Sequence, residues 1–210
     1  MKRTIFLPFL LLLFYTTLFG IEQDSSYVSP TKLYYNYVLN TALDGYLDEW
    51  MQNTYGLNPV IGFEFSTNVS PTFDGVIEFS VSRNRGSYNY YWYDINHQDF
   101  TFLYEKIGLG VRICDRRLIK RTAFLEGGLD AIHAKEWNEV YSKSGDAIGC
   151  HIAAGFWGNI QRNWIVQVKG KMQFLAIPMR TDHYYTDHYY SSYEMDFSGV
   201  GISIGFGLSK

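Results

Sequence analysis

The sequence predicts an all-β protein, an eight-stranded antiparallel up-and-down transmembrane β-barrel. Three observations predict this fold class. Segments in which every other residue is apolar recur along the chain, and the connections between them alternate between long and short. After the first twenty residues no apolar run has the length of a spanning helix. A chain that crosses a membrane without such helices must cross it with strands that close into a barrel.

The first segment is expected to be a secretory signal peptide over residues 1–20. Lys2 and Arg3 precede the apolar stretch 5–19, and the small residue Gly20 stands before a polar segment. A basic start, a short apolar core and a small residue are the three parts of such a signal. Cleavage after Gly20 would leave residues 21–210 as a single barrel domain.

Eight segments have the period-two alternation of strands whose two faces differ. The clearest is the last, where Val200, Ile202 and Ile204 alternate with glycine and serine. The predicted strands are 32–39, 61–65, 77–81, 107–113, 123–131, 148–156, 164–174 and 200–208, the first with the weakest pattern.

The connections between these strands supply independent evidence. Long ones are expected at 40–57, 83–98, 135–146 and 177–193, and short ones at 68–73, 115–120 and 158–162. Bacterial transmembrane barrels have short periplasmic turns and longer extracellular loops. Proline cannot donate to a strand ladder, and Pro30, Pro59, Pro71 and Pro178 all fall at predicted strand ends, turns or loops.

Opposite the apolar stripes, the predicted strands carry charges that would face the lumen. This expected lumen charge network consists of Glu64, Glu78, Lys106, Arg112, Glu126, Asp130, Lys169 and Lys171. An eight-stranded barrel is just wide enough to be filled by side chains, so these charges must pair. Pairing about the predicted turns places Glu64 opposite Glu78, Lys106 close to Asp130, and Arg112 diagonal to Glu126. Arg112, Lys169 or Lys171 would neutralise the two glutamates, which predicts a charge-balanced plug.

Tyrosine and tryptophan are concentrated in the long connections. Such side chains provide large contact area at a small entropic cost. The expected extracellular contact residues are Tyr90, Tyr91, Trp92, Tyr184, Tyr185, Tyr189 and Tyr190. His183 and His188 lie in the same region with Asp182 and Asp187, but their spacing is nonspecific, so we predict no metal site.

Several classes of function are not supported by any motif. The net charge of −3 argues against a nucleic-acid partner. No phosphate-binding glycine loop, nucleophile elbow or Cys-x-x-Cys pair occurs, so no enzyme activity and no cofactor are expected. His151 is read as a lumen residue bonded to its neighbours. Cys114 and Cys150, separated by a whole predicted strand, are expected to be free thiols.

Two stretches, 123–129 and 196–208, resemble the broad family of small bacterial outer-membrane β-barrel proteins that contains the OmpX, OmpW and opacity-type porin-like proteins. The resemblance covers nearly the whole mature chain and is one of pattern. It implies integration into the bacterial outer membrane and contact with its lipid, and no common activity. Members usually end in an aromatic residue, whereas this chain ends in Leu208, Ser209 and Lys210.

The expected function is therefore that of a monomeric, non-enzymatic outer-membrane barrel. It would act through its long extracellular loops, in contact with an extracellular ligand or host surface, or in membrane integrity. Two alternatives remain open at this stage. One is a small-solute conduit of the OmpW or porin type. The other is a secreted soluble barrel that binds an apolar ligand, as lipocalins do, with its apolar face turned inward.

Overall fold

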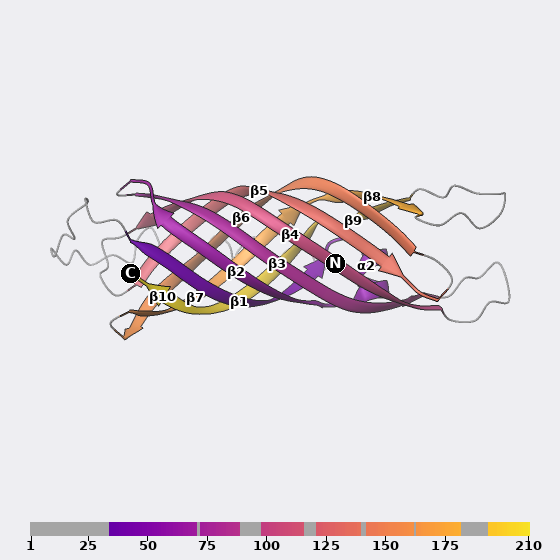
Figure 1. Ribbon diagram of the computed structural model, residues 1–210, viewed down its shortest axis with the longest axis horizontal. Coiled ribbons are helices and arrows are strands. Elements are labelled where there is room, and N and C mark those ends of the chain that lie inside the picture. The colour runs from indigo at the N-terminus through magenta and orange to yellow at the C-terminus, as the bar shows by residue number, and fades with distance from the viewer. Residues whose placement is uncertain are drawn as a thin grey trace, which may run out of the picture.

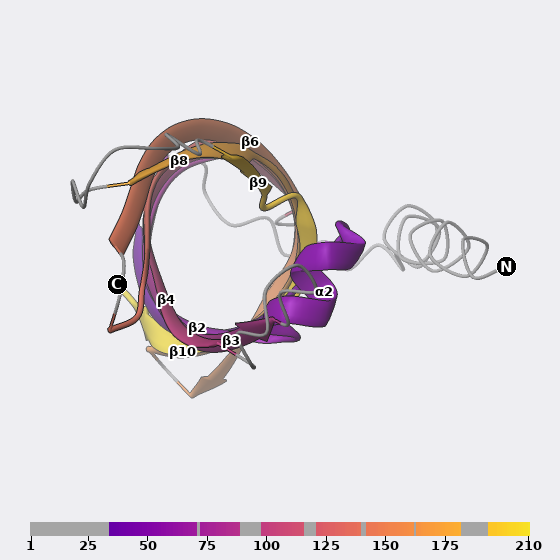
Figure 2. The same ribbon diagram turned by 90° about the vertical axis from the view of Figure 1, so that its right-hand side faces the viewer.

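The computed structural model describes residues 34–70, 72–88, 98–115, 121–139, 142–161, 163–181 and 193–210, which form a closed antiparallel sheet (Figures 1 and 2). Strand β8 follows β7, and β10 follows β9, so ten segments form the eight strands of a barrel. The sheet closes because β1 pairs with β10 and β5 with β6. The strands are β1 (Tyr35–Tyr46), β2 (Asn58–Asn68), β3 (Phe73–Tyr88), β4 (Gln98–Asp115), β5 (Arg121–Trp137), β6 (Ser142–Gln161), β7 (Trp164–Phe174), β8 (Ala176–Thr181), β9 (Tyr193–Asp196) and β10 (Gly199–Ser209).

The two ends of the barrel differ. We call the end that carries α2, β8 and β9 the loop end, and the opposite end, where the chain finishes, the turn end (Figure 1). The single described helix, α2 (Glu49–Tyr55), follows β1 at the loop end. The Asp48 side chain caps it by accepting a 2.8 Å hydrogen bond from the amide of Met51, and Gly56 ends it at φ 64°. Among the described residues, no helix combines the length and the apolar character needed to cross a membrane.

The outer surface of the barrel is apolar over its middle. Leu109 on β4 is 59% exposed, Leu129 on β5 is 61% exposed, and Ile204 on β10 is 61% exposed. Their neighbours along each strand point inward, as the pleat requires. Aromatic residues lie at the turn end of this belt, where Trp164 and Phe206 stack with ring centroids 4.8 Å apart. The predicted assignment of the apolar stripes to the outside is therefore correct.

Several strands are longer than the apolar stripes suggested. The first strand is Tyr35–Tyr46 rather than 32–39, so it occupies part of the expected loop 40–57, and α2 occupies more of it. The expected long connection 135–146 is wrong, because β5 runs to Trp137 and β6 begins at Ser142. Strands β3 and β8 likewise extend into the expected loops 83–98 and 177–193.

The physical reason is a change of face. On β4 the apolar residues point outward from Ile107 to Ile113, but nearer the loop end Phe100, Phe102 and Tyr104 are apolar and buried inside. The apolar alternation therefore changes phase at the edge of the membrane belt. The outward apolar stripe therefore ends at this edge, although the strand continues beyond it.

The prolines and cysteines follow the prediction in part. Pro59 is the second residue of β2, as expected, but Pro178 lies inside β8, opposite Glu194 of β9. Strand β6 pairs with β8 at only two positions, so a residue without an N–H group is tolerated at position 178. Cys114 is buried in the lumen and Cys150 is exposed on the outer face, and both are free thiols, as predicted.

Candidate functional site

The lumen holds a network of buried charges centred on Arg112, which is 1% exposed. Its Nη2 donates to Glu64 Oε1 at 2.7 Å and to Glu126 Oε2 at 2.5 Å, and its Nε donates to Glu126 Oε2 at 3.0 Å. The guanidinium carbon also lies 4.1 Å from the centre of the Phe124 ring, which covers it on the turn side. Arg112 therefore joins two acids from different strands.

Lys169 of β7 reaches across the lumen to the strands on the opposite side. Its Nζ lies 2.9 Å from Glu64 Oε2, 2.7 Å from Glu78 Oε2 and 3.7 Å from Glu126 Oε1. Glu78 is also bound by Lys106 at 2.8 Å and by Lys171 at 3.3 Å. Each of the three glutamates is thus paired with at least two cations, which offsets the cost of burying them.

His151 of β6 completes the network on the side of β5. Its Nδ1 lies 2.9 Å from Asp130 Oδ2, and its Nε2 lies 3.2 Å from Glu126 Oε1. Inward glycines make the room for this ring, since a Cβ on Gly128 would lie 2.7 Å from His151 Cε1. Within the described residues its hydrogen bonds include no serine, threonine or cysteine.

The structure brings all eight residues of the expected charge network into the interior, with one register and one pairing different from those expected. Glu64 and Glu78 are register partners, as expected. Arg112 lies directly opposite Glu126 rather than diagonal to it, because the true register is shifted from the expected one. Lys106 and Asp130 are diagonal neighbours, close to one another as expected, but no direct ion pair joins them among the described residues. Lys106 binds Glu78, and Asp130 is bound by His151.

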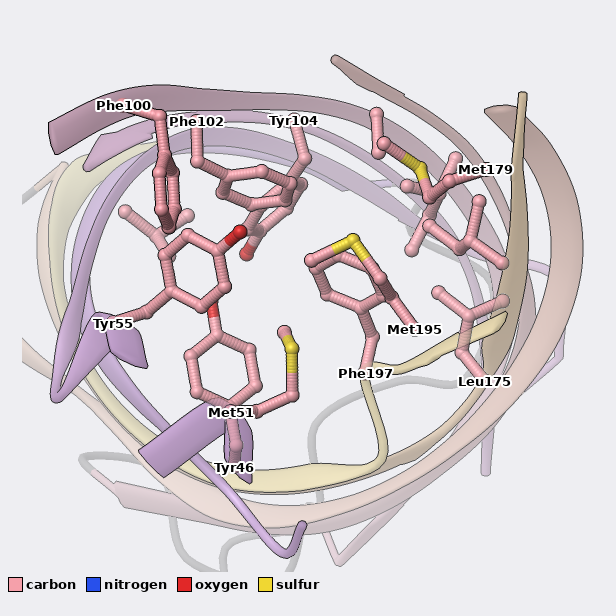
Figure 3. Packing of buried hydrophobic residues seen from close by; sticks show 14 residues of the cluster. Tyr46, Met51, Tyr55, Phe100, Phe102, Tyr104, Leu175, Met179, Met195 and Phe197 are labelled. Carbon is pink, nitrogen blue, oxygen red and sulfur yellow. The ribbon is translucent and has the colours of Figure 1, made fainter. Parts of the chain in front are cut away.

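An apolar cluster fills the lumen above this network, at the loop end (Figure 3). Met51 and Tyr55 of α2 point into it, and the Tyr55 hydroxyl donates to Glu136 Oε2. Phe102 stacks against Phe197 with ring centroids 5.2 Å apart. The loop-end cluster contains Tyr46, Met51, Tyr55, Val60, Phe100, Phe102, Tyr104, Ile132, Ala134, Leu175, Ile177, Met179, Met195 and Phe197.

Reasoning from the sequence missed this cluster. The expectation was a lumen lined by charges and small residues, with the segments at the loop end read as loops. A signal was present in the alternation of Phe100, Phe102 and Tyr104, and again in that of Leu175, Ile177 and Met179. Both alternations place their apolar residues on the same face as an inward charge, Lys106 in the first and Lys171 in the second. They therefore lie on the face opposite the outer apolar stripe.

A second, smaller apolar cluster closes the lumen at the turn end. It consists of Val38, Cys114, Phe124, Trp157 and Ile165. The thiol of Cys114 lies 3.1 Å from Asp74 Oδ2, which also accepts from the hydroxyl of Tyr34. The described lumen therefore has three layers, with the charge network between two apolar clusters.

Two small cavities lie beside the charges. They adjoin Lys171, one on the side of Tyr104 and one on the side of Ser80, and each has a volume of about 20 Å³. A space of that size holds about one water molecule.

Charges inside and an apolar belt outside define a transmembrane β-barrel with a filled lumen, the architecture of small barrels in the bacterial outer membrane. This arrangement contradicts the soluble lipocalin-like alternative, which requires the opposite faces. The predicted contact residues Tyr90, Tyr91, Trp92, Tyr184, Tyr185, Tyr189 and Tyr190 lie outside the described residues, as does the predicted signal peptide.

Comparison with known proteins agrees at the level of the fold. No family model matches the chain, and no curated protein matches it. The chain is similar to the solved structure of the outer membrane protein OprG from Pseudomonas aeruginosa, with a TM-score of 0.63 and 8% identity, over 86% of this chain and 97% of that one. It is also similar to Neisserial surface protein A, with a TM-score of 0.53 and 8% identity, over 87% of this chain and 98% of that one. The expected resemblance to small outer-membrane barrels is confirmed as one of fold.

Membrane integration predicts a specific behaviour in cell fractions and on gels. The protein should stay in the outer-membrane fraction after a carbonate wash, because its exposed apolar belt has no other favourable environment. The unheated protein should migrate differently from the boiled protein, since the closed barrel resists detergent at room temperature. Recovery in the soluble periplasmic fraction would contradict this assignment.

Proposed function

We propose that the protein is a non-catalytic, non-conducting outer-membrane barrel that acts through its loop end, in contact with other surfaces or in membrane integrity. The observation that carries the proposal is the filled lumen. A conduit needs a continuous path for its solute, and here the ion network lies between two packed apolar clusters.

Side-chain hydrogen bonds fix the helix at the loop end to the barrel. Helix α2 is fixed by its cap at Asp48, by Gln52 donating to the carbonyl of Tyr46 at 2.7 Å, and by the bond from Tyr55 to Glu136. Asn84 of β3 also donates to the carbonyl of Tyr55 at 2.8 Å. Rigid scaffolds that present variable loops are a common basis for surface contact. In this proposal the tyrosine-rich connections, which follow β3 and β8, provide the contact surface.

The rival conduit function is tested by conductance in planar bilayers. Purified wild-type protein should show no steady conductance steps, whereas a general porin reconstituted at the same protein-to-lipid ratio should show them. Large, steady steps from folded wild-type protein, checked by its gel mobility, would overturn the non-conducting part of the proposal.

The contact role is tested on intact cells. Replacing Tyr90, Tyr91, Trp92, Tyr184, Tyr185, Tyr189 and Tyr190 with serine should reduce the adhesion of expressing cells to host-cell layers and matrix-coated surfaces. Surface display of the variant, measured with an epitope tag, must equal that of the wild type. Unchanged adhesion at equal display would leave membrane integrity as the role. That role is measured by the sensitivity of deletion strains to detergent.

A further inference from the structure

The outer face of β3 to β6 changes from apolar to cationic over three successive rows of side chains. A row here means residues that are register partners across neighbouring strands. The lowest of the three rows is apolar, with Phe79, Ile107, Ala131 and Ile148. The middle row contains Val81, Glu105, His133 and Asp146. The upper row contains Arg83, Leu103, Lys135 and Ser144, and it continues to Arg180 on β8.

A groove of about 830 Å³ runs between the lower two rows. The same two rows continue across β2, where Phe63 and Ile61 line the groove, and Leu39 of β1 lines its far end. Six strands at about 4.8 Å spacing give the groove a length of about 24 Å, close to that of an extended fatty acyl chain. Its floor is lowered by the small outward side chain of Ala131.

The groove climbs toward the loop end as it passes from β2 to β6. On β2, seven residues separate Ile61 from Asn68 at the turn end of the strand. On β6, fifteen residues separate Asp146 from Gln161 at the turn end. The low end of the groove is therefore lined by Leu39, Ile61 and Phe63, and the high end lies under the cationic row.

Within the part of the chain that the structure describes, the upper-row cations have no ionic partners. Arg83 and Arg180 are exposed and Lys135 is half-buried, and none of the three forms an ion pair within the described residues. Arg85, two residues beyond Arg83 on the same face, is also exposed and forms no ion pair with a described residue. Of the acids in the middle row, Asp146 accepts from His133 at 2.8 Å, and Glu105 is the register partner of His133. Two of the nearby acids thus flank the histidine one row below the cations, and a third, Glu194 of β9, is the register partner of Pro178, two residues from Arg180.

We propose that this face binds a phosphorylated lipid of the outer leaflet. One acyl chain would lie in the groove between Leu39 and Ile148, and phosphate oxygens would be bound by Lys135 and Arg180 at its high end. Arg83 lies two strands from Lys135, about 10 Å along the row, where it binds a second phosphate. The apolar low end, the polar high end and the cations beyond it match the order of chain, headgroup and phosphate in such a lipid. The proposal rests on membrane integration and not on the contact role of the loops.

The proposal is tested with protein folded into phosphatidylcholine nanodiscs and titrated with diphosphoryl lipid A, with bound lipid counted by native mass spectrometry. The double variant Lys135→Gln with Arg180→Gln should bind the lipid about thirtyfold more weakly, since each cation near a membrane surface contributes a factor of about five. Lys210→Gln, which removes an exposed cation at the turn end, should bind like the wild type. Gel mobility of the unheated samples checks that each variant is folded.

The groove has its own variant and control. Ala131→Trp fills the groove and should weaken binding, whereas Ala154→Trp, a matched change on the outer face of β6 away from the groove, should not. Lipid A without phosphates should lose the dependence on Lys135 and Arg180. Equal binding by the double variant and the wild type would overturn the phosphate site. Equal binding by Ala131→Trp and Ala154→Trp would overturn the chain site, as would equal competition by a soluble phosphorylated disaccharide without chains.

Discussion

Replacing Arg112 with alanine is expected to lower the free energy of unfolding by about 3–5 kcal/mol, the usual cost of removing one partner of a buried ion pair. Arg112 makes the shortest ion pairs to both Glu64 and Glu126 among the described residues, and both contacts are buried. Among the described residues, its loss leaves Glu126 with Lys169 at 3.7 Å and His151 at 3.2 Å. Urea titration of protein folded in lipid vesicles, followed by tryptophan fluorescence and gel mobility, measures the change.

A paired variant separates the loss of charge balance from the loss of packing. In the double variant Arg112→Met with Glu126→Gln, a neutral side chain of similar length replaces the arginine and one acid is neutralised. It should recover a large part of the lost stability, because an uncharged pair has little desolvation cost. An unchanged urea midpoint for Arg112→Ala would show that the network does not stabilise the barrel.

Replacing Phe102 with alanine is expected to cost about 3–5 kcal/mol, the range for deleting a buried aromatic ring. Phe102 is fully buried at the loop end, where it packs against Phe197, Tyr55 and Tyr104. Its removal should also loosen α2, because Tyr55 of the helix loses a ring partner whose centroid lies 5.0 Å away. The same urea titration measures the stability, and protease susceptibility near α2 measures the loosening.

The matched control lies one residue away. Leu103→Ala on the outer face of β4 removes a similar apolar volume without touching the lumen. It should lower stability by much less, and α2 should stay protected from protease. If Phe102→Ala and Leu103→Ala behaved alike, the loop-end cluster would not be a core.

The sequence was sufficient to predict the strands wherever the outer face is apolar and contacts lipid and the inner face carries charged or small residues. Val200 to Leu208 alternates with glycine and serine in this way, and the predicted range 200–208 nearly coincides with β10. The opposition of Glu64 to Glu78 also followed from the predicted turn between β2 and β3.

The rest required three-dimensional information. The pairing of Lys106 with Glu78 depends on a neighbouring strand, and that of Lys169 with Glu64 joins residues 105 positions apart in the chain. The contacts of His151 with Asp130 and Glu126 depend on the space that Gly128 leaves for its ring. The inward apolar residues at the loop end were missed because the barrel extends beyond the bilayer there. Its outer face then meets water and is polar, and its inner face is apolar, as in a water-soluble protein.

The distribution of lumen charges among strands has a consequence for how the barrel assembles. Before closure, β2 and β3 carry the two acids Glu64 and Glu78 on one side of the unfinished sheet, and β7 carries the two bases Lys169 and Lys171 on the other. Only rolling the sheet shut brings them within contact of each other. The opposite charges attract β2 and β3 to β7 across the lumen. A seam joined one residue out of register would set inward residues of β1 against outward residues of β10, so the barrel could not close with these charges facing one another. Ion pairing across the lumen thus depends on correct formation of the seam.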